Sequence, residues 1–122
     1  MIVGVGVDVV DVGRFIAAIT RTPALIERIF TPRERVTGTG QRRAPGSLAA
    51  RFAVKEAVAK ALGSGPGLAF ADAEVISGPH GRPTLVVHGS VARRARELGV
   101  EDWQISMSHD GGVALATVIA QR

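Results

Sequence analysis

The sequence predicts a small α+β fold: one domain over residues 1–122, with a largely antiparallel sheet and one long central helix. Two observations lead to this prediction. Runs of alternating small and β-branched residues occur near both ends of the chain, and an alanine-rich segment of fifteen residues without glycine or proline lies between them. The expected order is strand, two helices, two strands, helix and two strands, which is typical of α+β domains rather than of parallel α/β sheets.

The first forty residues contain one expected strand and three helix starts. Valine, isoleucine and glycine alternate over residues 2–7, which predicts a strand that ends near Asp8. A helix is expected to begin near Asp11 and to include the segment RFIAAIT. Residues 23–30 begin with a proline, which suits the first turn of a second helix. The segment TPRE at residues 31–34 has the pattern of a capping box and marks a third start.

The central helix is the clearest element. Ser47 is expected to cap it and Gly63 to end it. Beyond it, the segments GPHG and DGG have the composition of hairpin turns, and each lies between two strand-like segments. We therefore expect strands at 73–78 and 82–89, a short surface helix at 90–99, and strands at 103–110 and 112–120.

The composition excludes several classes of protein. The chain has no cysteine, which excludes disulfides, zinc–thiolate sites and thiol catalysis. No apolar run approaches the roughly 20 residues of a membrane helix, so we expect a cytoplasmic protein without a membrane partner. A domain of this length buries only about two-thirds of its unfolded surface, which makes self-association favourable.

Positive charge gathers in one part of the chain. Between Arg14 and Arg43 lie seven arginines and two glutamates, a net charge of +5, whereas the whole chain carries +4. Such a surface attracts an acidic partner, or it is simply solvated. It also fits a nucleic-acid-binding domain that is not an enzyme. Aromatic residues make up only 4% of the chain, which weakens that alternative because single strands are bound by stacking.

Two carboxylates occupy unusual places. Asp8 follows an apolar strand, and Glu56 lies in the alanine-rich helix with Lys60 one turn beyond it. In the plainest interpretation Asp8 caps the next helix and Glu56–Lys60 is a surface pair. In the alternative, Asp8 and Glu56 converge on one Mg²⁺, which proteins hold with one or two carboxylates plus substrate phosphates, and Lys60 points at those phosphates. Arg51 and Lys55 lie on the adjacent row, within reach of further phosphates.

The segment SMSHD at residues 106–110 resembles a catalytic triad only in composition. Consecutive strand residues point to opposite faces, so Ser108, His109 and Asp110 cannot form a relay. His109 alone is suited to binding a phosphate or moving a proton. No Walker sequence and no complete Rossmann glycine pattern is present.

Taken in order, GVGVDVV, FTPRE, ARFAVKEAVAKALG and SMSHD resemble the holo-[acyl-carrier-protein] synthases, the small class of 4'-phosphopantetheinyl transferases. The resemblance extends over essentially the whole chain. Val7, Val9 and Met107 stand where isoleucine or leucine is common, and these are conservative changes. Residues 37–46 are least similar to the family.

The resemblance implies a fold, a reaction and a set of residues. The family has a 4'-phosphopantetheinyl transferase fold and moves the 4'-phosphopantetheine group of coenzyme A to a serine of an apo acyl carrier protein, with Mg²⁺ as cofactor, releasing adenosine 3',5'-bisphosphate. Asp8 and Glu56 match its metal ligands, and with Lys60 its catalytic residues. Glu56 would help to deprotonate the serine, directly or through a metal-bound water molecule. Residues matching the coenzyme A and phosphate contacts are Arg51, Lys60, Gly63, Pro83 and His109.

The resemblance also implies two protein partners. In this family, arginines of the first helical region receive the acidic carrier protein; Arg14 matches that position, and Arg21 and Arg28 are neighbours. The family also forms homotrimers with active sites at subunit interfaces. The resemblance argues against a nucleic-acid partner for the Arg14–Arg43 segment. A magnesium-dependent phosphohydrolase remains a further alternative, since it would share the metal and phosphate contacts.

Overall fold

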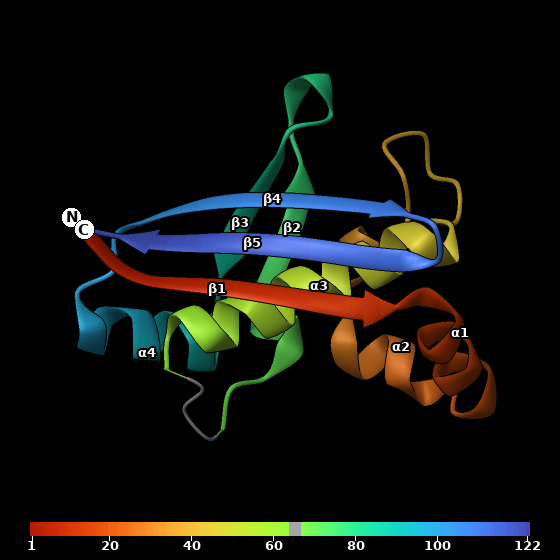
Figure 1. Cartoon of the computed structure of the whole chain (residues 1–122), viewed down its shortest axis with the longest axis horizontal. Coiled ribbons are helices and arrows are strands. Elements are labelled where there is room, and N and C mark those ends of the chain that lie inside the picture. Colours follow the sequence, from red (N-terminus) through yellow and green to blue (C-terminus); the bar gives the residue numbers. More distant parts are fainter. Residues whose placement is uncertain (64–66) are drawn as a thin grey trace.

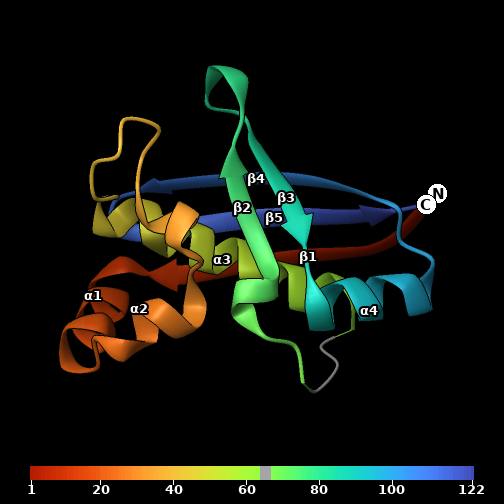
Figure 2. The same cartoon turned by 180° about the vertical axis from the view of Figure 1, so that it is seen from behind.

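The computed structural model describes residues 1–63 and 67–122, and the helix α3 (Pro45–Ala61) lies at its centre (Figure 1). A three-stranded sheet of order β1-β5-β4 covers one side of α3, and the hairpin β2-β3 crosses the other side (Figure 2). The strands and other α-helices in the described part of the chain are β1 (Ile2–Asp11), α1 (Val12–Arg21), α2 (Ala24–Ile29), β2 (Ala73–Ser77), β3 (Pro83–Val87), α4 (Gly89–Leu98), β4 (Asp102–Asp110) and β5 (Val113–Gln121). Short 3-10 helices are η1 (Pro32–Arg35), η2 (Phe70–Asp72) and η3 (Pro79–Gly81).

This architecture confirms the predicted α+β class. Each strand pairing is antiparallel, as expected, although the strands form two sheets rather than one. The turn between β4 and β5 is a two-residue hairpin at Gly111 and Gly112, whose φ angles are +57° and +80°. Two successive positive φ angles define the type I′ turn, which matches the twist of the strands and favours glycine at both positions. Within the described residues, no helix is both long and apolar enough to span a lipid bilayer.

The first strand is longer than predicted. β1 continues to Asp11 because each of its residues from Gly4 onward pairs with β5, with Asp8 opposite Ala116. The residue that caps α1 is Asp11, whose carboxylate accepts a hydrogen bond from the N–H of Arg14 at 2.9 Å. The capping role considered for Asp8 is therefore wrong, and Asp8 is a carboxylate within a strand.

Two glycines allow β1 to lie directly on α3. A Cβ atom at Gly4 would lie 1.9 Å from the carbonyl oxygen of Ala61, and one at Gly6 would lie 1.9 Å from that of Ala57. Two strand residues advance about 6.6 Å and four helix residues about 6.0 Å, so the two backbones stay in step. Asp8 comes next on the same face of β1, and the packing brings it to the middle of α3.

The start of α3 also differs from the prediction. The helix begins at Pro45 after Ala44, not at a cap provided by Ser47. Proline suits this position because the first N–H groups of a helix have no partner within it. The Ser47 hydroxyl instead accepts a hydrogen bond from Arg51 Nη1 at 2.7 Å.

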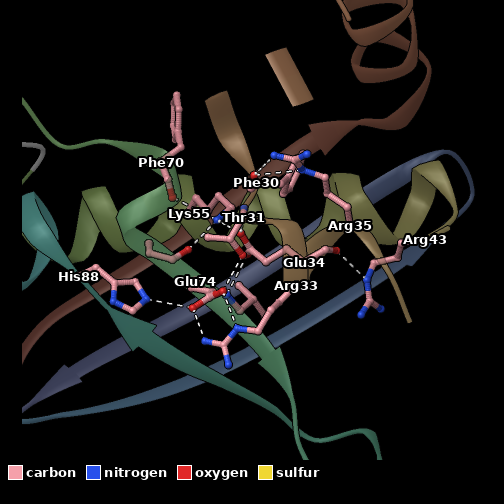
Figure 3. A network of polar contacts seen from close by, with 12 residues as sticks. Phe30, Thr31, Arg33, Glu34, Arg35, Arg43, Lys55, Phe70, Glu74 and His88 are labelled. Carbon is pink, nitrogen blue, oxygen red and sulfur yellow. Dashed lines mark hydrogen bonds and ion pairs between the residues drawn. The ribbon is translucent and has the colours of Figure 1, made fainter. Parts of the chain in front are cut away.

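A buried polar network joins η1, α3 and β2 (Figure 3). Lys55 Nζ lies 2.8 Å from Glu34 Oε1, and both side chains are fully buried. Glu34 Oε1 also accepts from the N–H of Thr31, and its Oε2 accepts from the N–H of Val75. The predicted capping box at residues 31–34 is confirmed, although it starts a 3-10 helix rather than an α-helix. Lys55, expected near phosphates, is instead part of the core.

Glu74 extends this network to the surface. Its carboxylate accepts two hydrogen bonds from Arg33 and one from the Thr31 hydroxyl at 2.6 Å. His88 Nε2 lies 2.9 Å from Glu74 Oε1, within hydrogen-bond distance. The hydrogen bonds from Arg33, supported by those from Thr31 and His88, lower the pKa of Glu74 to about 2 although burial opposes them. The carboxylate is therefore charged throughout the neutral range and fixes η1 against β2.

Candidate functional site

Asp8 and Glu56 come together where β1 crosses the middle of α3. Lys60 Nζ lies 3.0 Å from Asp8 Oδ1 and donates to the carbonyl oxygen of Val7, also at 3.0 Å. Within residues 1–63 and 67–122 no ion pair joins Lys60 to Glu56, so the expected surface pair between them is not formed. Lys60 instead joins the helix to the strand beside the two carboxylates.

The environment of Glu56 favours a bound cation. Burial raises the pKa of Glu56, the neighbouring Asp8 carboxylate raises it further, and Lys60 lowers it. A half-buried carboxylate repelled by a second one gains stability when a positive ion binds between them. In the described part of the chain, no three His, Cys, Asp or Glu side chains form a metal cluster. An oxygen-only pair that leaves further ligands to water and substrate fits Mg²⁺ rather than zinc.

An apolar cavity of about 760 Å³ opens beside the carboxylate pair. It is lined by Phe52 and Glu56 of α3, by the end of β1, by α1 and α2, and by the segment that leads into η2. The ring centroid of Phe52 lies 5.6 Å from that of Phe15 and 5.4 Å from that of Phe70. No sequence pattern predicted this cavity. Phe15 and Ile19 are four residues apart on α1, and this helical spacing indicates that they share one apolar face. Phe70 lies outside any periodic segment, so its place in the lining had no such indication.

Two of the three predicted carrier-binding arginines border this cavity. Arg14 and Arg28 line it, together with Asp8 and Glu56, whereas Arg21 is exposed at the end of α1 and is not part of the lining. The rim of the cavity thus combines positive side chains on α1 and α2 with the carboxylate pair on β1 and α3. The arginines would attract an acidic macromolecule to this rim, and the carboxylate pair lies next to them.

A second group of predicted residues meets at the N-terminus of α3. A Cβ atom at Gly46 would lie 3.1 Å from His109 Nδ1, so the imidazole packs over the first turn of the helix. The N–H groups of that turn have no partners within the helix and carry partial positive charge. The imidazole and the unpaired N–H groups of a helix end thus lie side by side, a combination whose chemistry suits an anion.

Arg51 and Pro83 lie on the β2 side of this region. Arg51 is buried and donates to the hydroxyls of Ser47 and Ser77, and Ser77 pairs with Pro83 across the β2-β3 hairpin. Burial lowers the pKa of Arg51 to about 10, with a further decrease from Arg43. The guanidinium therefore supports the residues around it rather than facing solvent.

Gly63 is at the opposite end of the central helix. It follows α3 with a φ of +83°, a left-handed conformation that favours glycine. The 17 residues of α3 span about 25 Å, so Gly63 and His109 cannot contact one small group within a single chain.

Comparison with known proteins gives a consistent result. Residues 4–118 match the sequence profile of the 4'-phosphopantetheinyl transferase superfamily. A holo-[acyl-carrier-protein] synthase of Salinispora arenicola is 57% identical over 100% of both chains, and one of Streptomyces coelicolor is 57% identical over 98% of each. The structure of the Neisseria meningitidis synthase has a TM-score of 0.88 at 31% identity over 100% of both chains. That of the Helicobacter pylori synthase, a complex with coenzyme A, has 0.83 at 29% identity over 96% of this chain and 99% of that one.

Proposed function

Because this chain belongs to the 4'-phosphopantetheinyl transferase superfamily, we propose that its carboxylate pair and the cavity beside it perform the reaction of a holo-[acyl-carrier-protein] synthase. The enzyme transfers the 4'-phosphopantetheine group of coenzyme A to a serine hydroxyl of an apo acyl carrier protein. The serine oxygen forms a bond to the phosphorus next to the pantetheine, the bond from that phosphorus to the bridging oxygen breaks, and adenosine 3',5'-bisphosphate leaves. The observation that carries this proposal is the pairing of Asp8 with Glu56 beside a cavity with arginines at its rim.

Asp8 and Glu56 are the residues that would hold Mg²⁺. Both offer carboxylate oxygens at one place, and burial followed by repulsion from Asp8 raises the pKa of Glu56, an unfavourable environment that a cation would relieve. When bound, the ion neutralises charge on the pyrophosphate, which is the main requirement of phosphoryl transfer. We therefore propose Mg²⁺ as the cofactor and coenzyme A as a substrate.

The remaining site residues would bind and orient the substrates. Lys60, half exposed beside Asp8, supplies a cation for the pyrophosphate. His109 and the first turn of α3 would receive a phosphate of the nucleotide, with Arg51 behind them and Pro83 bordering the same region. Glu56 would also help to remove the serine proton, directly or through a water molecule held by the metal.

The arginines of α1 and α2 would receive the carrier protein. Acyl carrier proteins are acidic, and Arg14 and Arg28 would bring such a partner to the rim of the cavity next to Glu56, with Arg21 as an outer contact. A nucleic-acid-binding domain would use the same positive charge, but it would have no use for two carboxylates that meet beside an apolar cavity. We infer a cytoplasmic enzyme of this kind, with residues 1–122 acting as one unit.

We further propose a homotrimer whose subunits meet through the outer face of the three-stranded sheet. On this face, away from α3, β1 exposes Val5, Val7 and Val9 at 55%, 49% and 60%. On β5 the exposed apolar residues are Val113 and Leu115. A contiguous apolar patch of this kind marks an association surface. Association would also bring the nucleotide contacts of one subunit to the carboxylates of another, which accounts for the distance between His109 and Gly63.

Charge on this face is expected to dissociate the protein. Wild-type protein should have about three times the 12.7 kDa mass of the chain in light scattering after gel filtration. Val7→Lys places an ammonium group in the proposed interface and should give a monomer with about a hundredfold less transferase activity. Val86→Lys on β3, which is 38% exposed outside this face, is the matched control and should remain a trimer. A monomeric wild-type protein would contradict the proposed assembly.

The proposed reaction is tested by the intact mass of an apo acyl carrier protein. After incubation with this protein, coenzyme A and Mg²⁺, we expect the carrier to gain the mass of one phosphopantetheine arm. With EDTA in the mixture, the gain should fall by at least about a hundredfold. Transfer that continues in EDTA would contradict the proposed requirement for Mg²⁺ but not the proposed transfer reaction. Cleavage of coenzyme A without a change in the carrier would indicate the phosphohydrolase instead.

A further inference from the structure

The buried pair of Glu34 and Lys55 contacts segments next to the apolar cavity, and the proposed reaction does not use it. Lys55 precedes Glu56 in the chain, but it points about 100° away around the helix, toward η1 and β2. Neither Glu34 nor Lys55 lines the cavity. The pair nevertheless contacts Phe70 of η2 and Thr31, which follows α2 (Figure 3), and both η2 and α2 contribute residues to the cavity lining.

One wall of the cavity is held by Lys55. Its ammonium group donates to the carbonyl oxygen of Phe70 at 3.1 Å and to that of Ala73 at 2.7 Å. These carbonyls bracket η2, so the two hydrogen bonds fix that turn against α3. Leu68, Ala69 and Phe70 form the wall that η2 and the residues before it present to the cavity. The position of this wall therefore depends on the Lys55 ammonium group.

The adjoining wall, formed by the end of α2, is held through Glu34. The N–H of Thr31 donates to Glu34 Oε1, the same oxygen that binds Lys55. Thr31 directly follows Phe30, the last residue of the turn that ends α2, and the Lys55 ammonium lies 5.5 Å from the centre of the Phe30 ring. Ile29, just before Phe30, lines the cavity. The end of α2 and the η2 wall are thus tied to one ammonium group.

A buried ion pair is an expensive way to fill space. Desolvation of two charges cancels much of their attraction, and apolar side chains of equal volume often give equal stability. Here the ammonium donates to three oxygens and the carboxylate accepts through both of its own, so every bond has a defined direction. What the pair adds over apolar packing is the fixed separation of the backbone segments it joins.

We propose that Lys55 and Glu34 are positioning residues that fix two adjoining walls of the apolar cavity, and hence its shape and the fit of the substrate group that enters it. The inference rests on the proposed function, because it requires that one of the two substrates occupies the cavity. It assigns no contact between the pair and either substrate. Its effect is transmitted through Phe70 and the end of α2.

The test is a comparison of Lys55→Met with Phe70→Ala and with the double variant. For each protein, KM and kcat are measured for coenzyme A and for apo carrier protein. Phe70→Ala is expected to raise one KM about tenfold by removing an apolar contact. Lys55→Met should raise the same KM by about five- to tenfold and change kcat by less than about twofold. The double variant should be no more than about twofold worse than the poorer single variant, because both substitutions disturb one wall.

Two further proteins separate positioning from stability. Glu34→Gln/Lys55→Met removes both charges together, leaves no unpaired buried charge, and should show the same change in KM. Val100→Ala reduces the core just before β4, whose start lies at the end of the molecule away from α1 and α2 (Figure 1). It should lower the melting temperature without changing either KM.

Several results would overturn the inference. An unchanged KM in folded Lys55→Met, a loss confined to kcat, or additive effects in the double variant would each reject it. Phe70→Ala with both KM values unchanged would reject it as well, because the cavity would then have no part in binding. If neither charge variant folds, the pair has a role in stability alone. Absence of transfer by the wild-type protein would instead refute the proposed function.

Discussion

Replacement of Glu56 by glutamine is expected to lower phosphopantetheine transfer by about a thousandfold and to leave the fold intact. The amide keeps the shape of the side chain but is a poor ligand for a divalent cation and cannot accept the serine proton. Burial and the Asp8 carboxylate raise the pKa of Glu56, so its charged form opposes folding at neutral pH. Loss of that charge should therefore keep the melting temperature within about 3 °C of the wild type or raise it slightly. Intact mass of the carrier protein and a thermal melt measure the two quantities.

Glu97→Gln is the matched control for this prediction. Glu97 is exposed on α4 and pairs with Arg94, three residues before it on the same helix. Its replacement removes the same charge from the chain and should leave transfer unchanged. Full activity in Glu56→Gln would reject Glu56 as a ligand and as a base. A large loss of melting temperature would show instead that Glu56 has mainly a structural role.

The elements that depend on local sequence were predicted well. Helix propensity and turn chemistry predict the central helix, the hairpin turn at Gly111 and Gly112, and the capping box at residues 31–34. The end of β1 was predicted too early. The chain continues as a strand through Asp8 because β5 pairs with it as far as Asp11, and that pairing involves residues about a hundred positions away.

The two lysines of α3 show why a site is harder to predict than a helix. Lys55 and Lys60 have the same chemistry and lie on the same helix, yet Lys55 is fully buried and the Lys60 side chain is 51% exposed. The difference arises from η1 and β2, which cover one side of α3 and supply Glu34 as a partner. Helical periodicity gives the direction of each side chain but does not indicate which distant segment will cover it.

Asp8 and Glu56 lie near each other in the structure, and the reason lies in the glycines of β1. Sequence alternation identified Gly4 and Gly6 as part of a strand, without indicating that their lack of a side chain brings that strand against α3. The site is therefore built from two features of β1: an absence of side chains at Gly4 and Gly6, and a carboxylate at the next position on the same face.

Gly6→Ala is accordingly expected to damage both the fold and the site. The added methyl group would lie 1.9 Å from the carbonyl oxygen of Ala57 and 2.8 Å from its carbon, and both atoms belong to a helix backbone that cannot rotate away. We expect a loss of about 3 kcal/mol or more in the free energy of unfolding, seen as a decrease of roughly 10–20 °C in melting temperature. The entropy that alanine removes from the unfolded chain offsets less than about 1 kcal/mol of this. In the molecules that remain folded, the added methyl group must hold β1 farther from α3. This separates Asp8 from Glu56 and should reduce transfer per folded molecule by about tenfold.

Gly38→Ala provides the comparison, because a Cβ atom at Gly38 meets no other atom within 4 Å. That variant should change the free energy of unfolding by less than about 0.5 kcal/mol and leave transfer unaffected. Equal melting temperatures for Gly6→Ala and Gly38→Ala would contradict the close packing of β1 on α3. A destabilised Gly6→Ala whose folded fraction keeps full activity would separate the two effects. It would show that Asp8 and Glu56 tolerate a wider spacing than the backbone contact imposes.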